Sequence, residues 1–208
     1  MSDQVVEGRL ELRKKPQQER SIQRLEAILE AAVELFVAKG INETTMSEIA
    51  ARAGISIGSL YQFFPQKVAV IKALHDRFTS RLEGFIHQVF KGVQTREEAA
   101  QRAADSLFDL YAMFRQEQIY QALWKAIVTD RDLRQISADY HEQIIAIFYR
   151  DMTHLIPEAD FDRFRINLKL IILATGEVIR YSTEQDEVLA RAHLEQWRRI
   201  IRVSIFAY

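Results

Sequence analysis

Apolar residues recur at intervals of three and four positions along nearly the whole chain, which is the spacing of an α-helix. No segment shows the sustained alternation of apolar and polar residues that predicts a β-strand. The chain contains 3 prolines and 7 glycines, so few positions interrupt the helical pattern. The sequence therefore predicts an all-α protein.

Capping residues and glycines divide this pattern into separate helices. Thr45 and Glu48 are spaced as a capping box, in which each side chain accepts a hydrogen bond from the backbone amide of the other residue. Gly40 and Gly54 are typical of helix ends, and Ser56 is typical of a helix start. The expected helices cover approximately residues 17–39, 45–53, 57–64, 66–90, 95–114, 116–128, 130–155, 161–181 and 187–207.

The segment 45–64 contains two helices of about two turns each, joined by a tight turn. Helices of this length are unstable alone, so tertiary packing must hold them. Ala50 is small enough for a helix crossing and Gly54 suits the turn, while Ile49, Ala53, Ile55 and Leu60 provide the inner faces. This is the spacing of a DNA-binding helix-turn-helix, although other helical hairpins share it.

A longer string, AILEAAVELFVAKGINETTMSEIAARAGISIGSLYQFFPQK at residues 27–67, resembles the N-terminal domain of the tetracycline-repressor (TetR) family. The resemblance covers roughly the first third of the chain. It implies a three-helix helix-turn-helix DNA-binding domain, whose third helix enters the major groove, followed by a larger helical ligand-binding and dimerisation domain. The matching positions are Ala31, Ala32, Phe36, Gly40, Thr44, Thr45, Ile49, Ala50, 53–56, Gly58, Leu60, Tyr61, Phe64 and Lys67.

The expected organisation has three parts. Residues 1–16 form a flexible basic arm, residues 17–67 form the DNA-binding domain with its motif at about 45–64, and residues 68–208 form the effector-binding and dimerisation domain. The segment from Arg9 to Arg24 contains six basic and two acidic residues. It is either a solvated tail or an arm that contacts DNA phosphates.

The resemblance also places a set of residues against DNA. Gln62 can pair bidentately with adenine, and Ile57 and Phe63, as exposed apolar groups, can contact thymine methyl groups. Position 63 departs from the histidine or tyrosine common in the family. Lys67 stands at the start of a helix, where its charge and the helix amides can meet a phosphate. The expected DNA-binding residues are Thr45, Ser47, Ser56, Ile57, Gly58, Ser59, Tyr61, Gln62, Phe63 and Lys67.

The charge of the chain limits how the predicted domain can bind DNA. The whole chain has a net charge of −1, and residues 1–67 carry nine basic and nine acidic side chains. Bulk attraction to phosphates is therefore weak, and DNA affinity must come from a few well-placed groups.

The remaining two thirds of the chain are rich in aromatic and aliphatic residues. The aromatic residues between 108 and 164 suit a pocket for a small, largely apolar or aromatic effector, although such residues more often form core. The expected pocket residues are Phe108, Tyr111, Trp124, Tyr149 and Arg180. The apolar faces of the last two helices predict a homodimer interface of Leu168, Ile171, Ile172, Thr175, Ile179, Leu194, Trp197 and Ile201, with burial inside one subunit as the alternative.

Several kinds of chemistry are not expected. The chain has no cysteine, its 5 histidines lack metal-ligand spacing, and it carries no glycine-rich phosphate loop or G-x-S-x-G motif. We expect no metal, no cofactor and no enzymatic activity. Because no apolar segment is long enough to cross a membrane or to serve as a signal sequence, we expect a cytoplasmic protein.

The sequence thus predicts a homodimeric, DNA-binding transcriptional regulator. It would act as a repressor that leaves a palindromic operator on double-stranded DNA when a small-molecule effector binds, with activation left open. The alternative is a helical protein-interaction or adaptor module whose helix-turn-helix is only structural.

Overall fold

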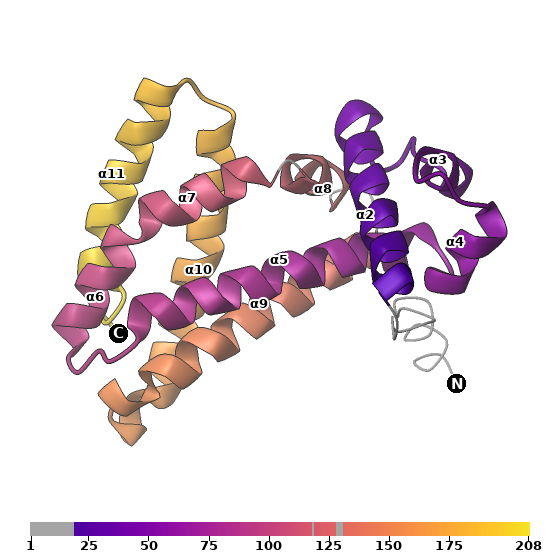
Figure 1. Cartoon of the computed structure of the whole chain (residues 1–208). Helices are drawn as coiled ribbons and strands as arrows, with labels where there is room; N and C mark the ends of the chain where they lie inside the picture. Colours follow the sequence, from indigo (N-terminus) through magenta and orange to yellow (C-terminus); the bar gives the residue numbers. More distant parts are fainter. Residues whose placement is uncertain (1–18, 118, 128–130) are drawn as a thin grey trace. The chain divides into compact units, whose positions relative to one another are not determined.

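A computed structural model of the chain describes residues 19–117, 119–127 and 131–208. In these residues the regular structure consists of α-helices and short 3-10 helices, without a strand (Figure 1). The prediction of an all-α protein is confirmed. The expected basic arm, residues 1–16, lies outside the described residues.

The chain divides into two compact units. The first comprises Met1–Phe78 and Gln118–Ser137, and the second comprises Thr79–Glu117 and Ala138–Tyr208. Two long helices, α5 (Lys67–Phe90) and α9 (Arg131–Met152), each contribute residues to both units. The position after residue 67, where the sequence predicts a domain boundary, lies within the continuous helix α5, and the described residues 119–127 and 131–137 belong to the first unit.

The first unit contains the expected helix-turn-helix. Besides its parts of α5 and α9, it holds α2 (Glu19–Lys39), α3 (Met46–Arg52), α4 (Ile57–Phe63) and α8 (Ile119–Ile127). The capping box is present, because Thr45 Oγ1 accepts from the Glu48 amide at 3.3 Å and Glu48 Oε2 accepts from the Thr45 amide at 2.8 Å. Gly54 has a φ of +67°, so the turn between α3 and α4 uses the left-handed conformation that favours glycine.

Fully buried side chains fix the angle between these short helices. Phe36 of α2, Ile49 of α3, Leu60 of α4 and the adjoining Phe64 are all inaccessible to solvent. Burial of this kind supplies the stabilisation that helices of two turns lack when isolated. The inner positions expected at Ile49 and Leu60 are thus confirmed.

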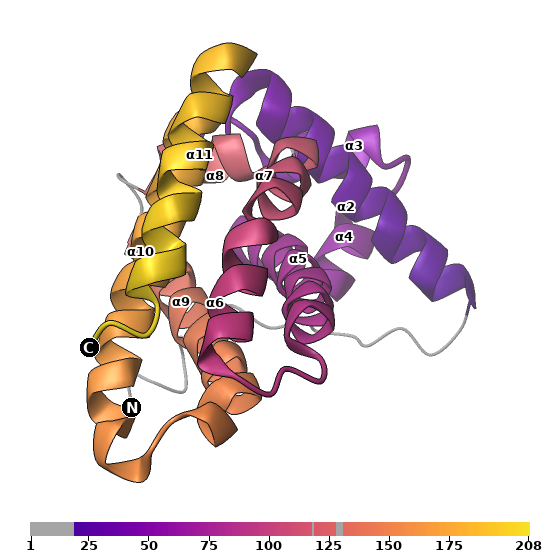
Figure 2. The same cartoon turned by 90° about the vertical axis from the view of Figure 1, so that its left-hand side faces the viewer.

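The second unit adds the helices α6 (Arg96–Asp105), α7 (Leu107–Gln116), α10 (Phe161–Thr183) and α11 (Glu187–Ser204), with 3-10 turns at Thr153–Leu155 and Glu158–Asp160. Helices α10 and α11 lie side by side, and α6 lies against α11 (Figure 2). The single helix predicted over 95–114 is interrupted at Ser106. The Ser106 hydroxyl donates to the Ala103 carbonyl at 3.1 Å and so competes with the helical backbone pattern.

Two side chains join α10 to α11. Asn167 Nδ2 donates to the carbonyl oxygens of Ser204 at 2.7 Å and Ile205 at 2.9 Å, at the end of α11. Trp197 Nε1 donates to Thr175 Oγ1 at 2.9 Å, further along the two helices. These hydrogen bonds fix the position of α11 along α10.

Candidate functional site: a helix-turn-helix and an apolar cavity

Helix α4 presents one side to solvent and the other to the core. Its N-cap residue, Ser56, accepts a hydrogen bond from the Ser59 amide at 3.1 Å. Ile57 and Tyr61 are 39% and 42% exposed, and Gly58 and Gln62 are exposed beside them. These four positions repeat at helical spacing, so they form one continuous outer face.

Phe63 does not belong to this outer face. Its side chain is only 4% exposed, although the sequence analysis expected it to contact thymine methyl groups. The correction has a simple geometric reason: position 63 lies three residues after Leu60, and residues at that spacing share one side of a helix. Phe63 therefore packs into the core with Leu60 and Phe64.

Gly58 has no structural requirement within the protein. A Cβ atom placed there would meet no heavy atom within 4 Å, and its φ is not in the left-handed region. A glycine inside a helix costs about 1 kcal/mol relative to alanine. The fold gives no reason for this cost.

Ion pairs fix α3 against α2. Arg52 of α3 pairs with Glu34, and Lys39 at the end of α2 pairs with Glu48. The hydrogen bond from Lys39, together with those from the Thr45 amide and hydroxyl, lowers the pKa of Glu48 to about 2. The exposed Thr45 and Ser47, both expected DNA contacts, therefore begin a helix whose start is held by charged and capping groups.

Lys67, the last of the expected DNA contacts, begins α5. Its ammonium group donates hydrogen bonds to backbone carbonyls of residues 41, 42 and 44, in the loop between α2 and α3. The structure therefore gives this charge an intramolecular role.

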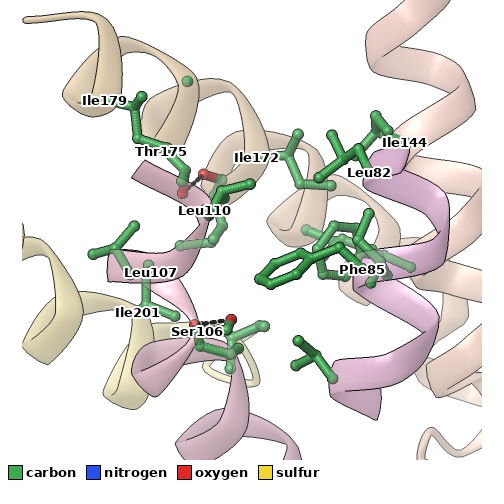
Figure 3. Close-up of a pocket in the computed structure, with 18 of the residues that line it drawn as sticks. Leu82, Phe85, Ser106, Leu107, Leu110, Ile144, Ile172, Thr175, Ile179 and Ile201 are labelled. Atoms are coloured by element: carbon green, nitrogen blue, oxygen red, sulfur yellow. Dashed lines mark hydrogen bonds between the residues drawn. The ribbon is translucent and has the colours of Figure 1, made fainter. Parts of the chain in front are cut away.

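The second unit contains a cavity of about 820 Å³, a volume that includes its open mouth. Helices α5, α7, α9, α10 and α11 all contribute to its wall. Figure 3 shows Phe85 of α5 pointing toward Leu110 of α7 and Ile172 of α10 across this space. Nearly all of the lining side chains are aliphatic or aromatic hydrocarbons, which suits a ligand of the same character.

The serine and threonine hydroxyl groups in the wall donate to backbone carbonyls three and four residues earlier in the chain (Figure 3). Ser106 Oγ donates to the Ala103 carbonyl at 3.1 Å, and Thr175 Oγ1 donates to the Ile171 carbonyl at 2.7 Å. A hydroxyl group has a single hydrogen to donate, so neither residue offers a donor to a ligand in this arrangement.

The other polar groups of the wall are adjacent residues of α9. Tyr140 and His141 both line the cavity, and their rings make an edge contact with centroids 5.5 Å apart. Burial raises the pKa of Tyr140 above its ordinary value, so the phenol stays neutral and keeps its proton. Apart from Ser106 and Thr175, this pair supplies the polar side chains of the cavity wall.

The five residues predicted to bind an effector do not line this cavity. Each has another environment. Phe108 lies under Arg191, Tyr111 donates to the Ser182 carbonyl at 3.4 Å, Trp124 contacts Tyr120 in the first unit, Tyr149 contacts Phe161, and Arg180 pairs with Glu177 and Glu184.

The difference between the predicted residues and the cavity lining has a consistent geometric origin. On α7 the cavity is lined by Leu107 and Leu110, whereas the prediction chose their neighbours Phe108 and Tyr111. On α9 it is lined by Phe148 and not by Tyr149. One residue along a helix corresponds to a rotation of about 100°, so these aromatic side chains project from a different side. The apolar repeat at 107, 110 and 114 is the side of α7 that lines the cavity.

The residues predicted for the dimer interface lie mostly along the wall of the cavity. Six of the eight, namely Leu168, Ile171, Ile172, Thr175, Ile179 and Ile201, line the cavity. Leu194 is buried in the same unit, and Trp197 is half-buried and bonded to Thr175. Of the eight, Leu168, Ile179, Leu194 and Ile201 are buried within the subunit, whereas Ile171, Ile172, Thr175 and Trp197 are partly exposed.

A different apolar stripe of α10 and α11 is open to solvent. On α10, Ile166 and Leu170 are 64% and 60% exposed, and Leu173 and Tyr181 continue the same face. On α11 the exposed apolar residues include Leu189, Ile200 and Val203. The spacing of these residues places them on one side of each helix, away from the cavity.

Two further properties concern only the described residues. No group of histidine, aspartate and glutamate side chains among them could hold a metal ion. None of the helices they form is long and apolar enough to cross a membrane.

Family models match both parts of the chain. The model for bacterial regulatory proteins of the tetR family matches residues 28–74, which include the helix-turn-helix. The model for the tetracyclin repressor-like C-terminal domain matches residues 97–207, which is more than half of the chain. The fold and these matches define a helix-turn-helix transcriptional regulator. The chain belongs to the TetR family.

Curated relatives match shorter stretches. The chain is 33% identical over 82 residues to the HTH-type transcriptional activator FasR of Mycolicibacterium smegmatis, covering 39% of this chain and 37% of FasR. It is 25% identical over 117 residues to the fatty acid metabolism regulator protein of Bacillus subtilis, covering 56% of each. The chain thus spans about half, or less, of the length of these relatives.

Solved structures of the same fold cover nearly the whole chain. The fatty acid degradation regulator FadR from Bacillus halodurans matches with a TM-score of 0.63 at 15% identity, covering 93% of this chain and 98% of FadR. The SmeT–triclosan complex matches with a TM-score of 0.62 at 20% identity, covering 86% of this chain and 88% of SmeT. At sequence identities of 15% and 20%, the similarity to these two structures shows a shared fold. The family is one of regulators and not of enzymes, which favours the regulator over the interaction module.

Proposed function

We propose that the protein is a homodimeric repressor that leaves a palindromic operator when a small, largely apolar effector enters the cavity of the second unit. The observation that carries this proposal is the cavity itself, whose wall consists almost entirely of hydrocarbon side chains. A regulator with such a cavity has a site where a small effector can bind, in addition to its DNA-binding surface.

The DNA contacts are assigned to the outer face of α4 and the start of α3. Gln62 reads adenine through its amide, Ile57 contacts thymine methyl groups, and Tyr61 donates to a phosphate. Gly58 allows the helix backbone to come close to the duplex. Ser56, Ser59, Thr45 and Ser47 contribute polar contacts that position the protein without encoding sequence.

The chemistry of the cavity narrows the effector class. Because Ser106 and Thr175 direct their hydroxyl hydrogens to backbone carbonyls, a ligand gains no donor along most of the wall. An acyl chain or an aromatic hydrocarbon loses least in such a place, with its polar group near Tyr140 and His141. Two of the similar proteins are named as regulators of fatty acid metabolism or degradation, and a third is a complex with triclosan.

The dimer is assigned to the exposed stripe of α10 and α11, with a second copy of the chain as its partner. Large apolar side chains such as Ile166 and Leu170 are costly in water, and their helical spacing suits a two-fold bundle of four helices. A two-fold dimer presents two copies of α4, which matches a palindromic operator.

Repression requires only that the protein occupy DNA that the transcription machinery needs. Activation needs a further surface for the polymerase, and the name of FasR shows that a relative is an activator. Transcription in vitro from a template with the selected operator distinguishes the two, because a repressor lowers the yield of transcript and an activator raises it.

The DNA-binding part is tested by selection from a pool of random duplexes, followed by sequencing. We expect a palindromic motif, and Gln62→Ala should lose preference at one position of each half-site, at a cost of about 1–3 kcal/mol. If the wild-type protein enriches no palindrome, the operator proposal is wrong.

The effector part is tested with saturated fatty acids of graded chain length and with triclosan. A ligand present at about 100 times its Kd raises the free energy of unfolding by about 2.7 kcal/mol, which a thermal melt detects. The same ligand should release the selected duplex. Ile172→Trp, which fills the cavity, should retain DNA binding and lose both responses; a ligand response that survives this substitution would place the effector elsewhere.

A further inference from the structure

The ammonium group of Lys67 is enclosed by backbone carbonyl groups of the loop that joins α2 to α3. Lys67 Nζ lies 2.6 Å from the Ile41 oxygen, 2.8 Å from the Thr44 oxygen and 3.2 Å from the Asn42 oxygen. A lysine ammonium has three hydrogens to donate, and it has no acceptor. The three carbonyls match this number of donors.

The loop that holds this ammonium is itself well anchored. Ile41 and Thr44 are buried, and the Thr44 hydroxyl donates to the Gly40 carbonyl at 2.8 Å. The three carbonyl oxygens point toward one location, where their partial negative charges repel one another in the absence of a cation. The lysine charge removes this repulsion, so the loop conformation depends on Lys67.

The loop leads directly into the DNA-binding motif. Thr45, the residue after the last bonded carbonyl, is the N-cap of α3. Since Lys67 is the first residue of α5, its side chain fixes the start of α3 relative to the start of α5, over 23 to 26 positions of sequence. Lys67 and the loop at residues 41–44 both belong to the first unit.

We propose that Lys67 is a positioning residue for DNA binding, which acts through the 41–44 loop and not through contact with a phosphate. This inference rests on the DNA-binding role proposed above. It replaces the expectation from sequence that the Lys67 charge meets a phosphate at the start of a helix. Removing Lys67 would misplace Thr45 and Ser47, which lie at the beginning of α3.

Two substitutions at Lys67 distinguish positioning through the loop from direct contact with a phosphate. Lys67→Met keeps the length of the side chain and removes its charge, whereas Lys67→Arg keeps the charge but presents a planar fork that cannot converge on three carbonyls. We expect both variants to bind a random-sequence duplex pool at least tenfold more weakly than the wild type. The slope of log affinity against log salt concentration should stay as in the wild type.

A direct phosphate contact gives a different result. Lys67→Arg would then bind like the wild type, and Lys67→Met would reduce the magnitude of the salt slope by about 0.9, the value for one phosphate. That outcome would overturn the proposal. Affinities are measured well below the melting temperature of each variant, so that loss of folded protein does not contribute.

A matched control separates positioning from general destabilisation. Ile28→Val removes one methylene group from a fully buried side chain of α2 and lowers stability without touching the loop. We expect it to lower Tm and to leave DNA affinity unchanged. If Ile28→Val and Lys67→Met weaken DNA binding equally at equal loss of Tm, the positioning role is wrong.

Amide hydrogen exchange tests the mechanism without DNA. In Lys67→Met the amides of the loop and of the first turn of α3, residues 41–49, should exchange faster than in the wild type, and in Ile28→Val they should not. Unchanged exchange in Lys67→Met would refute the proposal. If instead the wild type fails to bind DNA while exchange changes as expected, the proposed function fails and the positioning of α3 by Lys67 stands.

Discussion

Trp197 Nε1 donates a hydrogen bond to Thr175 Oγ1 at 2.9 Å, and the same oxygen donates to the Ile171 carbonyl at 2.7 Å. This chain of two bonds links α11 through a threonine side chain to the backbone of α10. Both helices also contribute to the wall of the cavity. The bond therefore belongs to the scaffold that gives the cavity its shape.

Thr175→Val should lower the free energy of unfolding by about 1–3 kcal/mol, because the half-buried indole N–H loses its partner. Urea unfolding of the full chain measures this. The pair Thr175→Val and Trp197→Phe provides the control, since the double variant should lose less than the sum of the single variants. Strictly additive losses would show that the bond contributes no coupling energy.

The capping box at α3 should make stability depend on pH. The pKa of Glu48 is about 2 in the folded protein against an ordinary value of 4.5, with the hydrogen bond from Lys39 as the largest cause. A lowered pKa means that the ionised form stabilises the fold above pH 4.5, and that this contribution is lost as the pH falls toward about 2.

Glu48→Gln removes this titration. The Tm of the wild type should exceed that of the variant near neutral pH, and the difference should shrink between pH 4.5 and about pH 2. Thermal melts followed by circular dichroism over this range measure the difference. Added salt should reduce the difference as well, because Glu48 is solvent-exposed. A gap in Tm that is the same at every pH would contradict the assignment.

Gly58→Ala should separate stability from function. Because a Cβ atom at position 58 meets nothing within 4 Å, the substitution should raise the free energy of unfolding by about 0.5–1 kcal/mol. It should weaken binding to the selected duplex, since the added methyl group stands between the helix backbone and DNA.

Gly84→Ala is the matched control for this prediction. Gly84 lies inside α5, and a Cβ atom placed there also meets nothing within 4 Å. It should raise stability by a similar amount and leave DNA affinity unchanged. If Gly58→Ala binds DNA as tightly as Gly84→Ala does, the backbone at Gly58 does not approach the duplex.

Leu170→Glu should abolish the proposed dimer, because a charge replaces a large apolar side chain on the exposed stripe of α10. Sedimentation velocity should show a monomer, with DNA affinity reduced as one half-site is lost. The control is Val37→Glu, a substitution at an exposed apolar residue of α2 that lies outside the stripe. A dimeric Leu170→Glu protein would move the interface away from this surface.

Local signals in the sequence were sufficient for the DNA-binding motif. Thr45 and Ser56 are N-caps, and Gly54 adopts a left-handed turn, as their residue types predicted. Each depends on hydrogen bonds or sterics within a few residues, so the sequence contains the necessary information. For the same reason, the predicted boundaries of α3 and α4 agree with the structure to within about one residue.

The lining of the cavity could not be predicted in this way. Periodicity shows that α7 and α10 each have an apolar side, but it does not show which other helix faces that side. Leu107 and Phe108 are adjacent apolar residues, and only packing against other helices decides that Leu107 lines the cavity. The role of Lys67 was inaccessible for a related reason, because its partners lie more than 20 positions earlier in the sequence.

Three cations of the first unit, Lys39, Arg52 and Arg77, are paired with glutamates of that unit. Cations neutralised in this way release few counterions from arbitrary DNA, so the protein should be held only weakly on the rest of the genome. Weak retention on competing sequences leaves more molecules free to search. A small number of copies per cell would then be enough to occupy the target site.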